Sequence, residues 1–211
     1  MVNFKKMTEA VINGNEELIV DITEEAVDEG IKPNEIIEKG LINGMNVVGK
    51  RFKVGDMFVP EVLMSAKAMK AGMNIVKPLL IESERHSSGK VLLGTVSGDL
   101  HDIGKNLVGM LMESGGLEII NLGTDIDSAE FAEKVKKHNP DVLAMSALLT
   151  TTMLSMRDTI EVLEEEGLRD DIKVMVGGAP VTQEFADEIG ADGWAPDAAS
   201  AKDLAFDLIK K

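Results

Sequence analysis

The sequence predicts an α/β fold in which an N-terminal four-helix bundle precedes a doubly wound, parallel sheet of five strands. Two observations support this prediction. Residues 1–82 show helical periodicity and few strand signals. From Lys90 onward, short apolar runs alternate with amphipathic segments, which is typical of parallel strands joined by right-handed helical crossovers. At 211 residues the chain is long enough for two modest domains.

The N-terminal part is expected to form four helices, over residues 3–12, 15–29, 33–51 and 60–81. Asn13-Gly14, Gly30 and Val54-Gly55-Asp56 are typical helix stops, and Pro33 and Pro60 lie at or near helix starts. Short connections between four helices favour an antiparallel bundle. Such a bundle serves as an oligomerisation module or as a cap over another part of a protein.

The C-terminal part is expected to alternate strands with helices. The strands are predicted over residues 90–95, 117–122, 141–146, 172–177 and 192–195. The helices are predicted over residues 104–114, 128–138, 152–167, 181–189 and 198–210. Five strands in this alternation indicate a flavodoxin/Rossmann-like sheet. The predicted domains are therefore residues 1–82 and 90–211, joined by a polar linker over residues 83–89.

Composition excludes several classes of function. The formal net charge of −15 opposes nucleic acid as a partner, because phosphate backbones are bound by clustered Lys and Arg. The absence of cysteine rules out disulfides, thiolate zinc sites and thiol nucleophiles. No run of eighteen apolar residues occurs and the N-terminus lacks a signal core, so we expect a cytoplasmic protein without a membrane span.

The segment Asp99-Leu100-His101-Asp102-Ile103-Gly104 is the most informative motif, because it places a histidine between a predicted strand and the next helix. Open α/β sheets bind their ligands at this carboxyl edge. Asp99 is close enough in sequence to accept a proton from the ring nitrogen that faces away from a metal. The alternative is a loop histidine that merely caps the following helix, and the spacing alone leaves both interpretations open.

The scarcity of histidine limits what kind of metal site is possible. The other two histidines are His86, in the polar linker, and His138, just before Asn139-Pro140. Neither is an obvious co-ligand for His101. A metal at His101 would therefore take one nitrogen from the protein and its remaining ligands from elsewhere, which indicates a macrocycle that carries its own metal.

Three loops are expected to meet at the carboxyl edge of the sheet, over residues 97–101, 146–152 and 177–180. Gly177 and Gly178 lack Cβ atoms where a long polar tail would pass, and Ser146 and Thr150 can hydrogen-bond such a tail. Taken singly, the glycines also suit turns and the hydroxyls suit helix caps. The phosphate-binding patterns GxxxxGK[ST] and GxGxxG are absent, and so is the GxSxG nucleophile elbow.

The three loops together resemble the corrinoid-binding proteins of methyltransferase systems and the cobalamin-binding module of methionine synthase. The matching residues are the D-x-H-x-x-G loop at Asp99–Gly104, the S-x-L loop at Ser146–Leu148 and the pair Gly177-Gly178. The resemblance covers nearly the whole chain, because the N-terminal helices match the family's four-helix cap. It implies a cobalamin or related corrinoid cofactor, in methylcobalamin and cob(I)alamin states.

The resemblance also implies roles for individual residues. His101 is expected to be the metal ligand, replacing the nucleotide base as the lower axial ligand of cobalt in a base-off, His-on state. Asp99 is expected to hydrogen-bond His101, and Thr152 to complete this catalytic relay. Methionine synthase has a serine where this chain has Thr152, so the chain departs from the family pattern there.

The displaced nucleotide tail is expected near the second and third loops, and three bundle residues are expected to contact the corrin or cover the upper face of the cobalt. The complete set of expected cofactor-binding residues is Glu38, Phe52, Val59, Gly98, Asp99, Leu100, His101, Asp102, Ile103, Gly104, Ser146, Leu148, Thr150, Gly177, Gly178 and Ala179. For Phe52 and Val59 the alternative is an ordinary place in the bundle core.

The resemblance implies a methyl carrier with no complete activity alone. A substrate-specific methyltransferase would load the methyl group, a second methyltransferase would pass it to a tetrahydropterin or thiol acceptor, and a corrinoid reductive activase would be a third partner. The methyl donor is left open among methylamines, quaternary amines, methanol and aromatic methyl ethers. The alternatives are a cobalamin-binding small subunit of a radical mutase and a cobalamin-sensing regulator.

Overall fold

A computed structural model describes residues 3–80 and 88–210. The chain divides into two compact units, one of Met1–Ser87 with Ser114–Gly116 and the other of Ser88–Glu113 with Leu117–Lys211. The predicted domain boundaries stay predictions, and residues 83–87 of the predicted linker, with His86, lie outside the described residues. No helix within the described ranges is both long and apolar enough to cross a membrane.

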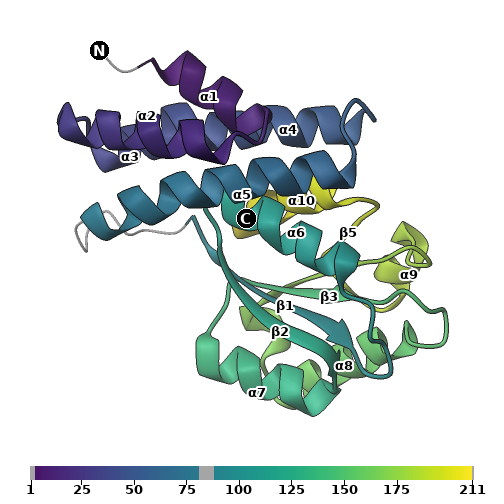
Figure 1. The fold of residues 1–211 in the computed structure, drawn as a ribbon. Helices are drawn as coiled ribbons and strands as arrows, with labels where there is room; N and C mark the ends of the chain where they lie inside the picture. Colours follow the sequence, from purple (N-terminus) through teal and green to yellow (C-terminus); the bar gives the residue numbers. More distant parts are fainter. Residues whose placement is uncertain (1–2, 81–87, 211) are drawn as a thin grey trace. The chain divides into compact units, whose positions relative to one another are not determined.

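The first unit is helical (Figure 1). Its helices are α1 (Phe4–Ile12), α2 (Glu16–Asp28), α3 (Pro33–Glu35), the π-helix η1 (Ile36–Ile42), α4 (Asn43–Lys53), α5 (Val59–Val76) and the short 3₁₀-helix η2 (Lys77–Leu79). Asn3 and Asn15 cap α1 and α2, since each side-chain oxygen accepts a backbone N–H three residues on, at 3.1 Å. Fully buried side chains, among them Met7, Ile19 and Leu41, form its core.

The predicted helix over residues 33–51 is confirmed as one helical stretch, but the π-helical turns of η1 in its middle were not foreseen. Two glycines of this stretch lie against α1. A Cβ atom at Gly40 would lie 2.0 Å from the sulfur of Met7, and one at Gly44 would lie 2.5 Å from Cβ of Val11. The glycines therefore allow a close approach between the two helices that a larger residue would prevent.

The second unit contains the predicted five-stranded parallel sheet, in the order β2-β1-β3-β4-β5. The strands are β1 (Lys90–Val96), β2 (Glu118–Ile126), β3 (Val142–Ser146), β4 (Lys173–Gly177) and β5 (Gly193–Ala195). This order is the doubly wound arrangement that the sequence predicts, with its switch point between β1 and β3. Strand β2 ends at Ile126, four residues beyond the predicted end at residue 122.

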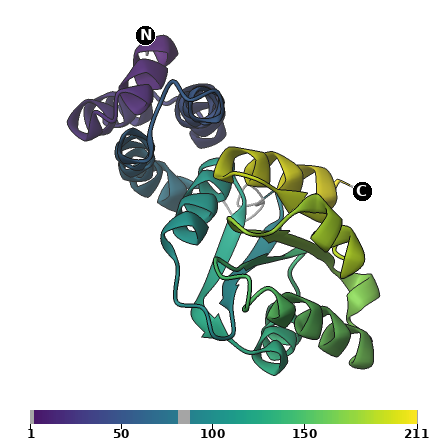
Figure 2. The ribbon, with the colours of Figure 1, turned by 90° about the vertical axis from the view of Figure 1, so that its right-hand side faces the viewer.

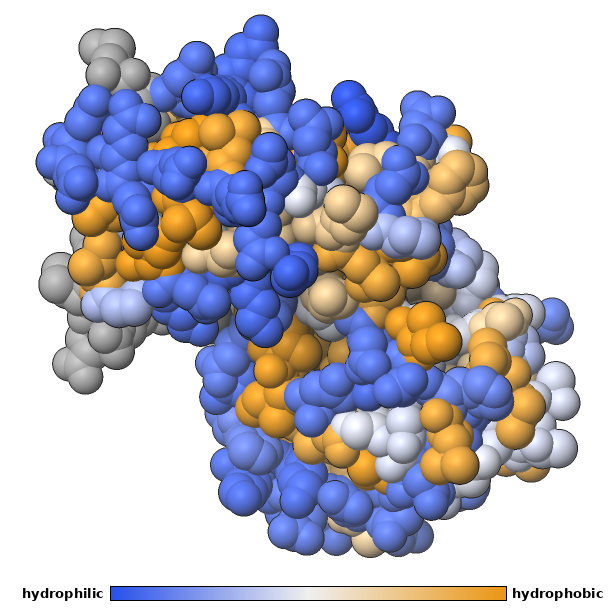
Figure 3. Space-filling view, in the orientation of Figure 1, coloured by the Kyte–Doolittle hydropathy of each residue, from blue (hydrophilic) through white to orange (hydrophobic). Residues whose placement is uncertain are grey.

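Helices cover both faces of the sheet (Figure 2). They are α6 (Ile103–Ser114), α7 (Ser128–His138), α8 (Leu154–Glu165), α9 (Gln183–Glu188) and α10 (Ala198–Ile209). Apolar residues of α7, α8 and α9 pack on one face, and those of α6 and α10 pack on the other. The outward side of α7, with Lys136 and Lys137 in its last turn, is largely hydrophilic (Figure 3). The loops at the carboxyl ends of the strands are left to form a site.

Candidate functional site

His101 lies in the loop between β1 and α6, with its imidazole held by Asp99. The ring atom Nδ1 lies 2.7 Å from Oδ1 of Asp99, and the backbone N–H of His101 donates to the same oxygen at 3.0 Å. The hydroxyl of Thr95 donates to the backbone carbonyl of His101 at 2.9 Å. The side chain is 52% exposed. Asp99 thus fixes one ring nitrogen and leaves Nε2 as the atom able to bind a ligand.

Asp99 is fully buried, and its second oxygen is satisfied by the loop after β3. Oδ2 accepts hydrogen bonds from the backbone N–H of Leu148 at 2.7 Å, that of Leu149 at 3.2 Å and the hydroxyl of Thr152 at 2.9 Å. The structure therefore brings Thr152, Asp99 and His101 into one hydrogen-bonded chain. Helix α8 begins at Leu154 and not at the predicted residue 152, because residues 150–153 form the turn that carries the Thr152 hydroxyl.

The environment of Asp99 keeps its carboxylate ionised at neutral pH. Burial acts to raise its pKa, but the hydrogen bonds from the backbone of His101 and Leu148 and from the side chains of His101 and Thr152 outweigh burial. The net result is a pKa far below the usual range for aspartate. An ionised Asp99 accepts the Nδ1 proton of His101, which leaves the lone pair of a neutral ring on Nε2.

Asp99→Asn is expected to destabilise the cofactor-free protein by about 2 kcal/mol at neutral pH, because an amide cannot accept hydrogen bonds on both sides. The pKa of Asp99 is lower in the folded state, so its ionised form stabilises the fold above its unfolded value near pH 4. This contribution falls as the pH drops below about 4. Urea unfolding of both proteins should show that the difference in their free energies of unfolding becomes smaller as the pH falls through this range. A difference that does not change with pH would contradict the account.

Exposed apolar side chains surround His101. Within the described residues, half of the exposed large hydrophobic side chains lie on the loops that hold Asp99 and His101 or on the first residue of the helix that follows each loop, namely Leu100, Ile103, Leu148, Leu149 and Leu154. Leu100 and Ile103, on either side of the histidine, are 73% and 79% exposed. Such a concentration of exposed apolar side chains is typical of a surface that binds a ligand. The exposed side chains favour a large, partly apolar ligand around the imidazole.

A row of small residues crosses the sheet at the carboxyl ends of four strands. Thr95, Ser146, Gly177 and Ala195 are neighbours in register on β1, β3, β4 and β5. Strand alternation puts them on the face that α6 and α10 cover, since Leu93, Ala144 and Met175 belong to the core on that face. The predicted tail-binding residues Ser146 and Gly177 are thus brought together, and Thr150, Gly178 and Ala179 are exposed in the adjoining loops.

The structure requires glycine at position 178 for a reason that the sequence interpretation did not include. Gly178 has a φ of +127°, and a Cβ atom built on it would lie 1.8 Å from the backbone oxygen of Ala147. The backbones of the β3 and β4 loops meet at this point, where the N–H of Ala147 donates to the carbonyl of Gly177 at 3.1 Å. A side chain at position 178 is excluded by this approach alone, without any ligand.

The remaining predicted residues of the second unit are in the His101 loop and the first turn of α6. Gly98 is left-handed, with φ +78°. Asp102 and Gly104 are exposed, and Asp102 accepts a hydrogen bond from the side chain of Asn106 at 3.0 Å. The sequence interpretation missed Asp125, whose carboxylate accepts the backbone N–H of Gly98 at 2.7 Å, and the bonding of Thr95 to the loop. An aspartate that follows Gly123-Thr124 in a strand was the available signal for Asp125.

The three predicted bundle residues belong to the first unit. Glu38 is exposed on η1, and Phe52 on α4 and Val59 on α5 are only partly buried. Partial burial fits both the predicted role of Phe52 and Val59 and the alternative, an ordinary place in the bundle core. The turn between α4 and α5 also carries exposed Phe58. The roles predicted for Glu38, Phe52 and Val59 toward a cofactor stay predictions.

The donor set around His101 is a single nitrogen. Over the described ranges, no group of three or more His, Asp or Glu side chains is placed to hold a metal ion. A single imidazole suits a metal that brings its other ligands, as the metal of a macrocycle does.

Comparisons with known proteins agree with this chemistry. Two family profiles match the chain, both described as a B12 binding domain, one over residues 89–202 and the other over residues 4–77. A corrinoid protein of Desulfitobacterium hafniense is 45% identical over 98% of this chain and 97% of its own length. The dimethylamine corrinoid protein of Methanosarcina barkeri is 45% identical over 97% of this chain and 96% of its own length.

A solved structure shares the architecture of both units. The methanol:cobalamin methyltransferase complex from Methanosarcina barkeri contains a chain that is 32% identical, with a TM-score of 0.87. The similarity covers 98% of the present chain and 79% of that chain. The helices and the five-stranded sheet therefore have the fold of a known cobalamin-binding protein.

Proposed function

Because the chain belongs to the corrinoid protein family, we propose that it is a methyl carrier, which takes a methyl group from one methyltransferase and delivers it to another. The chain binds cobalamin or a related corrinoid. When bound, the corrinoid supplies a cobalt centre that accepts a methyl group in its reduced state and later gives it up. The observation that best supports this proposal is the Thr152–Asp99–His101 chain at the carboxyl edge of the sheet.

The residues present fit a corrinoid. His101 offers one nitrogen to a metal whose other ligands come with the macrocycle. The exposed Leu100 and Ile103 offer apolar contact to a broad ring around that nitrogen. The small residues of the row at Ser146 and Gly177 suit a nucleotide tail that runs close to the backbone.

In the proposed carrier, each residue of the relay holds its neighbour. Thr152 and the backbone of Leu148 hold Asp99 as a carboxylate. Asp99 holds the proton of His101 on Nδ1 and so directs Nε2 to the cobalt.

The proposed partners are two methyltransferases and a reductive activase. The structural relative from Methanosarcina barkeri belongs to a methanol:cobalamin methyltransferase complex, and several relatives are named for dimethylamine or trimethylamine. Similarity to a dimethylamine corrinoid protein over 97% of the chain and to a trimethylamine corrinoid protein over 89% of it supports a methylated amine as the first donor to test.

Methyl transfer provides the test of this function. The chain is loaded with hydroxocobalamin, reduced chemically and mixed with radiolabelled dimethylamine, with and without the methyltransferase of a dimethylamine system. We expect label on the corrinoid protein only when the methyltransferase is present, and release of label when a thiol-dependent methyltransferase is added. Controls use trimethylamine and methanol with their own methyltransferases.

Two results would contradict the carrier function. The first is a combination of two observations: no methyltransferase of the panel transfers label to the chain, and the chain binds adenosylcobalamin more tightly than methylcobalamin. Such a preference for adenosylcobalamin is expected of a mutase subunit. The other is specific, cobalamin-dependent binding to promoter DNA, which is expected of a regulator.

A further inference from the structure

Strand β2 is irregular where it passes the His101 loop. Its register against β1 shifts twice, between the pairs Leu93–Asn121 and Gly94–Gly123 and again before the pair Val96–Ile126. Each shift gives β2 one more residue than β1, as in a β-bulge. Gly123 has φ +97°, and Asp125 has φ +58°, which is uncommon for a residue other than glycine. Backbone strain of this kind persists where the surrounding structure imposes it.

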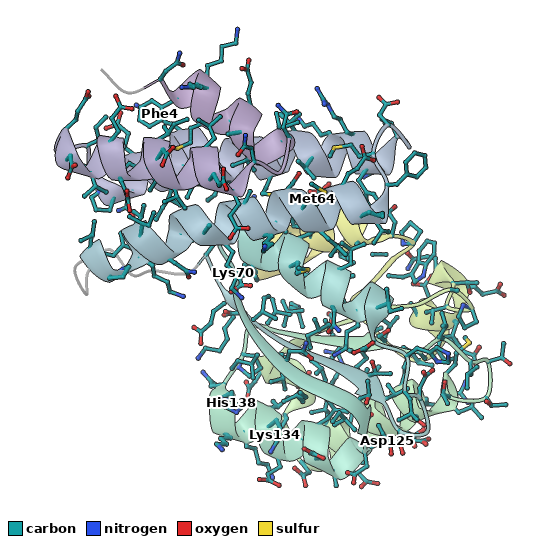
Figure 4. The ribbon with its side chains drawn as sticks, viewed as in Figure 1. Phe4, Met64, Lys70, Asp125, Lys134 and His138 are labelled. Carbon is teal, nitrogen blue, oxygen red and sulfur yellow. The ribbon has the colours of Figure 1, made fainter. Side chains whose placement is uncertain are left out.

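The second bulge turns Asp125 toward the chain just before His101. Oδ1 of Asp125 accepts the backbone N–H of Gly98 at 2.7 Å, and the N–H of Asp125 donates to the carbonyl of Asp99 at 3.1 Å. Figure 4 shows Asp125 at the carboxyl end of β2, well separated from His138 at the end of α7. Asp125 therefore holds the two residues that set the position of the Asp99 side chain.

The first bulge puts Asn121 in contact with the residues that follow His101. Oδ1 of Asn121 accepts from the ammonium group of Lys105 at 2.6 Å and from the N–H of Gly123 at 3.0 Å. Its amide nitrogen donates to Oδ1 of Asn106 at 3.0 Å, and Asn106 donates to Asp102. A network of side chains thus connects the bulge to the start of α6.

Lys105 is part of this network although it is only 4% exposed. Burial lowers the pKa of its ammonium group, and the charge of Asp102 acts in the opposite direction. A buried lysine is costly unless its donors are satisfied, and Asn121 supplies an acceptor. The sheet edge thereby holds the loop on both sides of His101.

We propose that the bulged end of β2 is a positioning element for His101, in which Asp125 holds residues 98 and 99 and Asn121 holds residues 102–106. The proposal rests on the proposed function only in taking His101 as the cobalt ligand. Neither Asp125 nor Asn121 needs to touch the cofactor. The competing explanation is that the bulges protect β2, an edge strand of the sheet, from pairing with another molecule.

Three substitutions at position 125 separate the hydrogen bond from the backbone conformation. Asp125→Asn keeps an acceptor oxygen and tolerates positive φ, whereas Asp125→Gly relieves the strain but removes the acceptor. Asp125→Ala removes the acceptor and does not relieve the strain of the positive φ. Asp127→Ala is the matched control, since Asp127 caps α7 through the N–H of Glu130 at 2.7 Å and does not hold the loop.

The first measurement is amide hydrogen exchange in the cofactor-free protein. Exchange at Gly98 and His101 is expected to rise roughly tenfold in Asp125→Gly and Asp125→Ala, from the loss of one charge-assisted hydrogen bond. Asp125→Asn should stay close to the wild type, and so should Asp127→Ala at these two amides. Asn121→Ala should raise exchange at Lys105 and Asn106 instead. Wild-type exchange in Asp125→Gly would overturn the proposal.

The second measurement is the fraction of added hydroxocobalamin that takes the His-on spectrum. It should fall in Asp125→Gly and Asp125→Ala and be restored in Asp125→Asn. Self-association of the variants with unchanged loop exchange would overturn the proposal in favour of edge protection. A missing His-on spectrum in the wild type would contradict the proposed function, whereas the exchange results would still decide the role of β2.

Discussion

Replacing His101 with alanine is expected to abolish the His-on absorption spectrum of the cobalamin-loaded protein and to weaken the binding of added cobalamin by at least about tenfold. This expectation follows from the geometry of the ring, whose Nδ1 is engaged with Asp99 at 2.7 Å and whose side chain is half exposed. Loss of an outer partner of a metal ligand costs roughly 10–100-fold in affinity, so loss of the ligand itself should cost no less. Spectral titration with methylcobalamin and hydroxocobalamin measures both effects.

His138→Ala is the matched control for His101→Ala. His138 ends α7 (Figure 4), and its backbone carbonyl accepts a hydrogen bond from Lys90 at the start of β1, whereas the His101 loop follows the opposite end of that strand. The control should keep the spectrum and the affinity of the wild type. An unchanged spectrum and affinity in His101→Ala would exclude His101 as the axial ligand. Equal losses in both variants would indicate a general loss of structure.

Gly178→Ala has the largest expected effect on stability, a loss of about 4 kcal/mol in the free energy of unfolding. The new Cβ would meet the backbone oxygen of Ala147, and this contact cannot be relieved by turning a side chain. Any relaxation must move the β3 and β4 loops apart, and the β3 loop carries Thr152 and the amides that bind Asp99. Denaturant unfolding of the cofactor-free protein measures the loss.

Gly190→Ala is the control for the effect of backbone conformation alone. Gly190 has φ +73° and no atom near the position of a new Cβ, so alanine there should cost only about 1 kcal/mol. The difference between the two variants gives the contribution of the close contact at Gly178. Equal losses would show that the approach of Ala147 does not make glycine necessary at position 178.

The architecture of the second unit was predictable because it depends on local patterns. Runs such as Val91-Leu92-Leu93 and Val142-Leu143-Ala144 are buried on both faces of a parallel sheet, so they are continuously apolar and easily recognised. Asn13-Gly14 and Gly30 ended the predicted helices close to where α1 and α2 end. The strand order follows from the same alternation of strands and helices.

The hydrogen-bonded chain of Thr152, Asp99 and His101 was predictable only in part. Asp99 and His101 are two residues apart, so their contact follows from the motif, whereas Thr152 was placed by resemblance and the structure puts its hydroxyl 2.9 Å from Asp99. The bonds from Leu148 and Leu149 could not be predicted, because backbone amides carry no sequence signal.

The irregular parts of the chain escaped prediction for physical reasons. The bulges of β2 depend on register against β1, which no local pattern specifies. Asp125 was therefore not recognised, although it holds Gly98. The π-helical turns of η1 have no local signal either, and the close approach of η1 and α4 to α1 at Gly40 and Gly44 is a tertiary contact.

Electron paramagnetic resonance of the protein loaded with cobalamin and reduced to the cobalt(II) state tests the central claim most directly. The axial nitrogen splits each cobalt line, into a triplet for the common nitrogen isotope and into a doublet for the heavier one. Protein produced with histidine in the heavier isotope should give doublets with an unlabelled cofactor, and His138→Ala should give the same result. Triplets that persist in the labelled protein would show that the cofactor's own base binds cobalt, which would contradict the role of His101.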